Sequence, residues 1–292
     1  MCEMPGGVMS GLRDPFDLDQ VGHDLLAHAL TLCGREEFTG ELRVAGAPGG
    51  TLHLRNGLVV GAQSPGAPGP EALLLRSGRV SGEEWAALVR ESGGARWPAA
   101  GLIARGYAGA AQLRVVCVMA LHDAVFAVLA GRVHGCERVA ETEPFATVAV
   151  GEASNRLLQE GVRRLTALAA LPHPVHPDRE RPHPVPGMDA GPLTALHREL
   201  LSHADGRSTA RDLAFRTGRG VYTVTVEMAR MLGEGLLECA ASPTPIPVRP
   251  LPGGQGVRQR DPSPPATPPL GPGTLPRRKP GGFFRLRNGA PK

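Results

Sequence analysis

The sequence has few aromatic residues and almost no lysine. Phe, Trp and Tyr make up 4% of its 292 residues, and all of its 32 basic residues except Lys279 and Lys292 are arginines. Together with abundant Ala, Gly and Pro, this bias is typical of a GC-rich coding sequence, so the arginine content by itself indicates no nucleic-acid ligand. The hydrophobic content of 41% is ordinary for a globular chain, and the length predicts one large or two modest domains.

The sequence also lacks the signals of a disulfide framework, of secretion and of a membrane span. Its five cysteines form no CxxC pair and no regular spacing, which favours reduced thiols. The first 19 residues hold four acidic side chains and no apolar run, so we expect no signal peptide and a cytoplasmic location. The most apolar segment, 113–130, is interrupted by Arg114, His122 and Asp123. We expect it to be too polar for a bilayer and to form a buried helix, so no membrane partner is predicted.

Charge is distributed unevenly along the chain. Residues 241–292 hold nine basic residues and one acidic residue, a net charge of +8, which leaves −4 for residues 1–240 because the whole chain carries +4. The part of the chain that is expected to fold is therefore mildly acidic, which argues against a large phosphate-binding surface. Within the basic part, GGFFRLRNG at 281–289 has the aromatic and basic content of a short docking motif.

Two proline-rich stretches divide the chain. LPHPVHPDRERPHPVPG at 171–187 has a proline at every second or third position in parts and no apolar periodicity, so it predicts an extended linker. Residues 241–292 hold too little apolar surface to offset the entropy of the chain, and we expect a disordered basic Pro/Gly-rich tail there. With a disordered N-terminus at 1–17, this leaves two folded units, at 18–170 and at 188–240.

The first unit begins with an amphipathic helix and continues with three short strands. The apolar positions of DLDQVGHDLLAHALTLC that recur at helical spacing are Leu18, Val21, Leu25, Leu26, Ala29 and Leu32. Strands are expected at 40–44, 51–54 and 58–62, with Leu52 and Leu54 on a buried face and His53 on the other. Asn56-Gly57 is a strong hairpin signal because both residues tolerate positive φ. An antiparallel meander is predicted.

Helices follow, with a weak internal repeat. LLLRSGRVSGEEW at 73–85 and GLIARGYAGAAQL at 101–113 align at an offset of 28 residues, each with a helix that ends before a glycine, Gly78 or Gly106. Ser81 with Glu84 forms a capping box. A long helix is expected at 109–131, one or two strands at 132–150, and a final helix at 152–171. The predicted apolar face of the final helix, with its arginines opposite, consists of Leu157, Leu158, Val162, Leu165 and Leu168.

The first unit resembles the PatA-type N-terminal domain, a module of uncharacterised molecular function found on bacterial response regulators and related signalling proteins. The resemblance covers residues 18 to about 170 and is carried by FTGELRV, GGTLHLRNGLVVGAQS, GPEALLLRSGRVSGEEW and LLQEGVRRL. The usual acidic end of the last motif is replaced here by RRLTALAAL. The resemblance implies an interaction or sensory module, not an enzyme, with a bacterial signalling protein as its partner.

The second unit has the layout of a helix-turn-helix. Helices are expected at 192–204, from an N-cap at Ser208 to Gly218, and from Gly220 to before Gly235, followed by a wing strand in LLECA at 236–240. ARDLAFRTGRGVYTVTVEMARMLGEGLL resembles winged-helix units of bacterial regulators, especially small actinomycete proteins encoded beside roadblock-type switch proteins. The fold class expected for the whole chain is α+β: a small antiparallel meander with packed helices, then a mostly helical winged helix-turn-helix unit.

The third helix of this layout would be the one that enters a DNA groove. The residues expected to face the core are Val221, Val224, Met228, Met231 and Leu232. Those left on the outside are Tyr222, Thr223, Val226, Glu227 and Arg230. Tyr222 and Thr223 are the candidates for contacts with bases or methyl groups, and the candidates for contacts with phosphates are Arg211, Arg216, Arg219 and Arg230. This face has few base-reading side chains, and a phosphate would repel Glu227. The alternative is a helical packing or dimerisation module, which predicts a homodimer.

No pattern predicts a cofactor, a metal ion or a catalytic site. His173, His176 and His183 have no carboxylate or cysteine at ligand spacing. His122 and Asp123 are neighbours on a helix and so point to different sides, which argues against a catalytic pair. GAPGG and GAPGPE lack the lysine and hydroxyl of a phosphate loop. Nothing in the sequence therefore predicts an enzyme.

Two functions remain. In the first, the protein is a non-enzymatic cytoplasmic regulator whose PatA-like domain receives a signal and whose winged helix binds DNA, with added affinity from the basic tail. In the second, it is a signalling adaptor in which both units bind proteins and no DNA is read. A helix-turn-helix fold does not decide between them, because such folds serve several functions.

Overall fold

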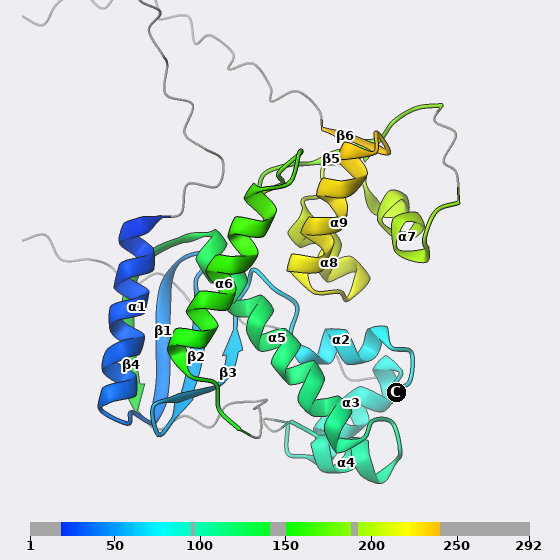
Figure 1. The fold of residues 1–292 in the computed structure, drawn as a ribbon. Coiled ribbons are helices and arrows are strands. Elements are labelled where there is room, and N and C mark those ends of the chain that lie inside the picture. Colours follow the sequence, from blue (N-terminus) through cyan, green and yellow to red (C-terminus); the bar gives the residue numbers. More distant parts are fainter. Residues whose placement is uncertain (1–18, 95–96, 141–149, 188–191, 240–292) are drawn as a thin grey trace, which may run out of the picture. The chain divides into compact units, whose positions relative to one another are not determined.

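The structure combines helices with a small antiparallel sheet, as predicted (Figure 1). This computed structural model describes residues 19–94, 97–140, 150–187 and 192–239. These residues belong to one compact unit, in which most buried apolar side chains form a single core and a few form a second, smaller one. The expected disorder at both ends of the chain concerns segments outside the described residues.

The sheet contains the predicted meander and one further strand. The strands β1 (Gly40–Ala47), β2 (Gly50–Arg55) and β3 (Leu58–Gln63) pair in sequence, and β4 (Arg132–Ala140) pairs with β1, giving the order β3-β2-β1-β4. Asn56 and Gly57 form the two-residue turn with φ values of 50° and 75°, so the hairpin prediction is confirmed. β4 is one of the one or two strands expected over 132–150, and residues 141–149 lie outside the described part of the chain.

The centre of β2 is buried on both faces. Leu52 and Leu54 lie in the core as predicted, but His53, expected on a solvent face, is only 6% exposed. Its Nδ1 atom lies 3.8 Å from a carboxylate oxygen of Glu41 on β1. The expectation of one open face at His53 is therefore wrong, and its burial lowers the pKa of the imidazole, which favours the neutral form.

The first helix, α1 (Gln20–Arg35), packs against the sheet with a face different from the predicted one. Val21 is 77% exposed and Leu25 is 37% exposed. The buried residues are Gly22, Leu26, Leu30 and Cys33, of which Leu26 was predicted, and the predicted Leu18 lies outside the described residues. The apolar spacing of this segment is compatible with two overlapping faces. The sheet selects the face with Gly22, where an added Cβ would lie 3.0 Å from the carbonyl oxygen of Val133 on β4.

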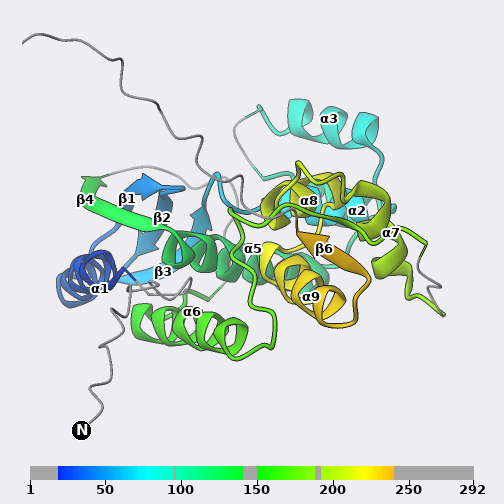
Figure 2. The same cartoon turned by 90° about the horizontal axis from the view of Figure 1, so that it is seen from above.

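The central helix is α5 (Ala110–Ala130), which contacts the sheet on one side and the C-terminal helices on the other (Figure 2). It confirms the long helix predicted at 109–131. Its length and apolar composition are also those of a membrane-spanning helix, so the expectation that its polar residues exclude a bilayer by composition is wrong. Most of it is buried inside the protein, and this burial supports its assignment as a core helix.

The next long helix, α6 (Ser154–Ala169), packs along α5 and α1. Leu157, Leu165 and Leu168 are buried as predicted. Arg164 departs from the prediction that the arginines lie opposite the apolar face. Its side chain is only 17% exposed and is directed to Asp123 of α5.

The 28-residue repeat is a structural one. The helix pairs α2 (Pro70–Arg76) with α3 (Gly82–Glu91), and α4 (Ala99–Ala104) with α5, occupy corresponding positions in the two copies. Gly78 and Gly106 have φ values of 69° and 71°, which end α2 and α4 in the same way. The smaller core contains two pairs of equivalent residues, Leu74 with Leu102 and Val80 with Ala108. It also contains Leu88 and Leu113, whose equivalents Val116 and Trp85 pack against it. The predicted capping box of Ser81 and Glu84 is present at α3.

The proline-rich segment 171–187 is packed against the rest of the chain. Val175 is fully buried, and Nε2 of His176 lies 2.8 Å from the carbonyl oxygen of Ala130 at the end of α5. The strand β5 (Pro182–Pro184) pairs with β6 (Leu237–Cys239), which follows the three C-terminal helices in the sequence. The segment predicted as an extended linker is thus held by contacts with the end of α5 and with β6.

The last described elements form a three-helix unit of α7 (Ala195–His203), α8 (Ala210–Thr217) and α9 (Val221–Gly233). Their order follows the prediction, although α7 begins three residues later than expected, and Gly218 ends α8 in the left-handed region with a φ of 58°. The N-cap of α8 is Thr209, one residue after the predicted Ser208, and it forms a capping box with Asp212. Leu237 to Cys239 form a strand as expected for LLECA, with the upstream β5 as partner.

Candidate nucleic-acid interface

The third helix of the unit, α9, is enclosed on several sides. It packs on α7 and α8 within the unit and also on α5 and α6. Val221, Val224, Met228 and Met231 are fully buried, as predicted for the core-facing side. Thr225 is fully buried as well. Among the first ten residues of α9 only Thr223 and Arg230 are exposed. A helix that reads a DNA groove needs a free face for base edges, and α9 offers little of one in this arrangement.

Tyr222 does not lie on the outside as the sequence predicted. Its ring contacts Phe126 of α5 edge-on, with centroids 5.3 Å apart, and the guanidinium of Arg164 lies 4.9 Å from its centroid. Such aromatic and cation–π contacts are individually modest but specific in geometry. Tyr222 is therefore a packing residue between α9 and the α5–α6 pair, and it does not lie on an open face of α9.

The four candidate arginines each face a carboxylate. Arg211 pairs with Asp178 of the proline-rich segment, and its backbone N–H donates to the carbonyl of Pro177. Arg216 lies 3.6 Å from Asp205. These contacts tie α8 to the segments that precede it and reduce the net positive charge available for phosphates.

The other two arginines are also paired. Arg219 donates from Nε and Nη2 to Glu199 of α7, at 3.1 and 2.9 Å, and Arg76 of α2 binds the same carboxylate at 2.8 Å. Arg230 lies 2.7 Å from Glu227 on its own helix. Glu227, expected on the outside, is only 17% exposed and also accepts from His197. Of the six predicted DNA-binding residues, Thr223, Arg216 and Arg230 are exposed, but no common face of free donors results.

The amino end of α9 is capped by a residue far away in sequence. Gly220 is its N-cap residue and provides no side chain, and α9 has no side-chain cap of its own. The carboxylate of Asp123 on α5 lies at this end of the helix, where a Cβ built on Gly220 would overlap its Oδ2 atom, and the backbone N–H groups of Val221 and Tyr222 lower the pKa of its carboxyl group. Orphan N–H groups at a helix start need such an acceptor, and a carboxylate also interacts favourably with the positive end of the helix dipole.

Asp123 also binds a cation on a third element. Nη1 of Arg164 lies 3.3 Å from Oδ1 of Asp123, while Nε of the same arginine lies 2.9 Å from Glu160. The side chain of Asp123 is 8% exposed. Its burial raises the pKa of the carboxyl group to about 6, against the opposing effects of Arg164 and the two N–H donors. Asp123, Arg164 and Tyr222 thus join α5, α6 and α9 at one point.

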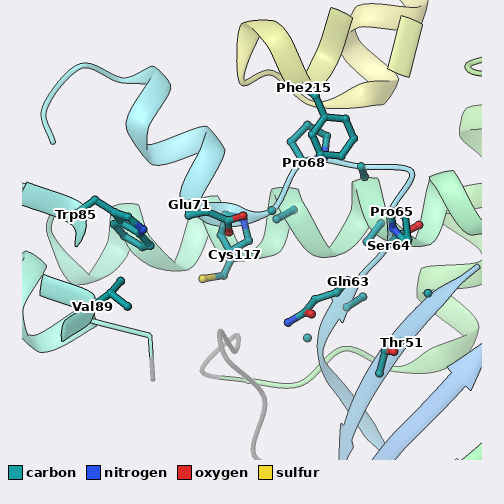
Figure 3. A pocket seen from close by; sticks show the side chains of 18 of the residues that line it. Thr51, Gln63, Ser64, Pro65, Pro68, Glu71, Trp85, Val89, Cys117 and Phe215 are labelled. Atoms are coloured by element: carbon teal, nitrogen blue, oxygen red, sulfur yellow. The ribbon is translucent and has the colours of Figure 1, made fainter. Parts of the chain in front are cut away.

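A cleft of about 870 Å³ opens beside α5 (Figure 3). It is lined by β3, the loop that follows it, α3, α5 and Phe215 of α8, with Trp85 at one end and Gln63 and Glu71 among its few polar groups. None of its described lining residues is Arg, Lys or His. Its size suits a ligand site, but no group of titratable side chains converges there.

Metal-ligating patterns are absent from the residues that the structure describes: no three His, Cys, Asp or Glu side chains are grouped to hold an ion. His183 instead lies 3.0 Å from Glu238 across the β5–β6 pair. Cys33 and Cys117 are free thiols in the core, where burial raises the pKa of each. Nothing in these positions assembles a nucleophile with a base.

Comparisons with models of known protein families, with curated proteins and with solved structures find no match to this chain. The resemblances to PatA-type domains and to winged-helix units therefore stay predictions, based on the motifs in the sequence alone.

The contact of Asp123 with α9 was missed by the sequence reasoning, although two signals for it exist. A charged residue in an otherwise apolar helical run must find a partner when it is buried. The third helix also starts after Gly220 with no Ser, Thr, Asp or Asn at its N-cap, whereas the second starts after Thr209. A helix without its own N-cap needs an acceptor for its first N–H groups, and a buried carboxylate needs donors. The fold places the two next to each other.

Proposed function

We propose that the protein is a non-enzymatic cytoplasmic regulator that acts through protein contacts, as a signalling adaptor, and that its three-helix unit reads no DNA while α9 is docked on α5 and α6. The observation that carries this proposal is the enclosure of α9 and, with it, the loss of Tyr222 from the outer face. A winged-helix layout for the three-helix unit and a PatA-like first domain remain part of the proposal, with a bacterial signalling protein as the expected partner.

Charge supports protein contacts over DNA contacts. Each candidate arginine faces a carboxylate, and Glu199 binds both Arg219 and Arg76. To contact a phosphate, each of these cations would have to leave an existing partner. The net charge of −4 over residues 1–240 adds a general repulsion for nucleic acid, which salt screens only in part.

An exposed apolar pair on α5 supports a protein partner. Val115 and Met119 are spaced four residues apart on the amino-terminal half of the helix and are 56% and 50% exposed. The opposite side of α5 at this level is buried in the smaller core through Leu113. Two neighbouring exposed apolar side chains on a rigid core helix are typical of a small contact patch.

The test is a selection of binding sequences from random DNA duplexes with the full chain. We expect retention that falls steeply with salt, enriches no sequence and is unchanged in an Arg216→Gln/Arg230→Gln variant, because any affinity then comes from the basic residues 241–292. Enrichment of one sequence with submicromolar affinity at physiological salt would refute the adaptor function. In parallel, Val115→Asp/Met119→Asp is expected to abolish cross-linking to a partner protein in cells, whereas Val21→Asp on α1, which is also an exposed valine on a helix, serves as the control.

A further inference from the structure

We propose that Asp123, Arg164 and Tyr222 form an autoinhibitory latch, which holds the amino-terminal half of α9 against α5 and α6 and withholds it from DNA. This inference goes beyond the adaptor function, because it assigns the protein a second, open state in which α9 is free to bind a duplex. The latch is defined by these three side chains and by Gly220.

The latch occupies the part of α9 that a DNA reader would use. In a helix-turn-helix that enters the major groove, residues at the amino end of the third helix contact the base edges. Here the carboxylate of Asp123 lies against Gly220 at the amino end of α9, and the ring of Tyr222 contacts Phe126 and Arg164. The same turn cannot make both sets of contacts, so docking and groove binding exclude each other.

The three-helix unit has internal contacts that remain both when α9 is docked and when it is free. The capping box of Thr209 and Asp212, the left-handed turn at Gly218 and the buried side chains of Val224 and Met228 all lie within the three-helix unit. The capping box and the turn are made by residues of the unit itself, and Val224 and Met228 belong to the core that α9 shares with α5 and α6. Contacts of α9 with α8 are more extensive than those with α5 or α6, so opening at the latch leaves the unit's own packing in place.

The docked state also has a desolvation cost, which makes closure of the latch reversible. Asp123 and Arg164 are both largely withdrawn from water, with side-chain exposures of 8% and 17%. Desolvation of a charged pair opposes most of the attraction between its members. A contact built from buried charges is therefore weaker than an apolar contact of the same size, and a competing ligand can displace it.

Gly220 provides a selective way to open the latch. Its φ of −61° and ψ of 135° are allowed for any residue, so alanine introduces no backbone strain. A methyl group at this position would overlap Oδ2 of Asp123 and lie 3.1 Å from its Cγ atom. Asp123 is short and buried, so its carboxylate has to turn away from the amino end of α9.

Gly109 provides the matched control. It is the N-cap residue of α5, with a φ of −76° and a ψ of 160°, and an added Cβ would meet nothing within 4 Å. Gly109→Ala therefore adds the same methyl group at another helix N-cap, where no carboxylate has to move.

The experiment measures amide hydrogen exchange at 221–226 and the affinity of the full chain for a fluorescent duplex of random sequence. In Gly220→Ala we expect exchange in this turn to rise about fivefold to tenfold, which corresponds to the loss of an ordinary helix cap, and the affinity for the duplex to rise about tenfold at low salt. Gly109→Ala and the wild type should give equal values. Unchanged exchange in Gly220→Ala would overturn the latch, and faster exchange without tighter binding would overturn autoinhibition.

Asp123→Ala keeps the proposal testable if Gly220→Ala does not fold. It removes the carboxylate from the other side of the contact and leaves Gly220 unchanged, so the same two changes are expected. In the double variant the methyl group at position 220 has no carboxylate to displace. Its exchange should match that of Asp123→Ala, and an additive effect would show that the alanine at 220 acts in another way.

Discussion

The helices α8 and α9 lie side by side in the three-helix unit, yet they are capped in opposite ways. α8 begins with a capping box made by its own residues, Thr209 and Asp212. α9 begins at a glycine, and the carboxylate beside its amino end is that of Asp123, almost one hundred residues earlier in the chain. A local cap defines where a helix starts, whereas a distant cap also defines where the helix is docked. The start of α8 is thus encoded nearby, and the start of α9 is coupled to the position of α5.

The largest expected effect comes from removing Arg164, the cation that pairs with Asp123. Arg164→Ala leaves Asp123 buried beside α9 without its charge partner, and we expect the free energy of unfolding to fall by about 3 kcal/mol. Chemical denaturation at pH 7.5 measures this change. Arg163→Ala is the control, because Arg163 pairs with the same Glu160 but its side chain is 70% exposed, and it should cost less than about 1 kcal/mol. Equal costs for the two variants would contradict a central role for Arg164.

The pH dependence of the free energy of unfolding measures the effect of the charge on Asp123. The pKa of Asp123, about 6 in the folded protein, lies above its unfolded value of 3.8 because burial disfavours the charged form. The folded state therefore binds the proton more tightly. The stabilisation from protonation is complete below about pH 4 and is lost as the pH rises through 6.

Asp123→Asn isolates this effect, since it removes the titration and keeps an oxygen that can accept from α9. The groups that face Asp123 are Arg164, Glu160 beyond it and Tyr222, and the adjacent His122 has a pKa lowered by burial. These are common to both proteins. Between pH 7 and pH 4 the free energy of unfolding of the wild type should therefore rise relative to the variant, by up to about 3 kcal/mol. A constant difference across this range would show that Asp123 is not desolvated in solution.

Local signals predicted the elements of this fold, and in several places their ends. The Asn56-Gly57 turn, the capping box at Ser81 and the left-handed Gly218 depend on residues close together in sequence, and the structure has all three. The repeat was visible for the same reason. Its two glycines, Gly78 and Gly106, must each end a helix whatever the helix packs against.

The faces of these elements were harder to predict, because a face is chosen by what covers it. The apolar residues of α1 permit two faces, and the sheet selects the one with Gly22. His53 alternates with two leucines and yet is buried, since β2 is covered on both sides. The proline-rich segment 171–187 has no periodicity of its own, and its order comes from contacts such as that of His176 with the end of α5.

The exposure of the candidate site residues was hard to predict for a related reason. Residues chosen as outward from helical spacing were assigned to solvent by default, although a second layer of helices can cover that side as well. Tyr222 and Arg164 are both amphipathic side chains with an apolar body and a polar tip, which suits a contact between layers as well as it suits a surface. Pairing of arginines with carboxylates on other elements, such as Arg219 with Glu199, leaves no periodic signal in the sequence.

The smallest expected effect comes from breaking the local cap of α8. Thr209→Ala removes the hydroxyl that accepts from the N–H of Asp212, at 3.3 Å, and also one partner of the Asp212 carboxylate. We expect a loss of about 1 kcal/mol of unfolding free energy. Hydrogen exchange should rise in the first turn of α8 and stay unchanged in the first turn of α9, since the two caps share no atom.

Thr223→Ala is the matched control, because Thr223 is an exposed threonine in the first turn of α9 and should change the free energy by less than about 0.5 kcal/mol. If the loss of Thr209 also freed the amino end of α9, the two helices would move as one body and the cap at Asp123 would hold the whole unit. If the amino end of α9 stays protected, its contact with α5 and α6 is independent of the cap of α8. The first residue of α8 is then defined within the three-helix unit alone.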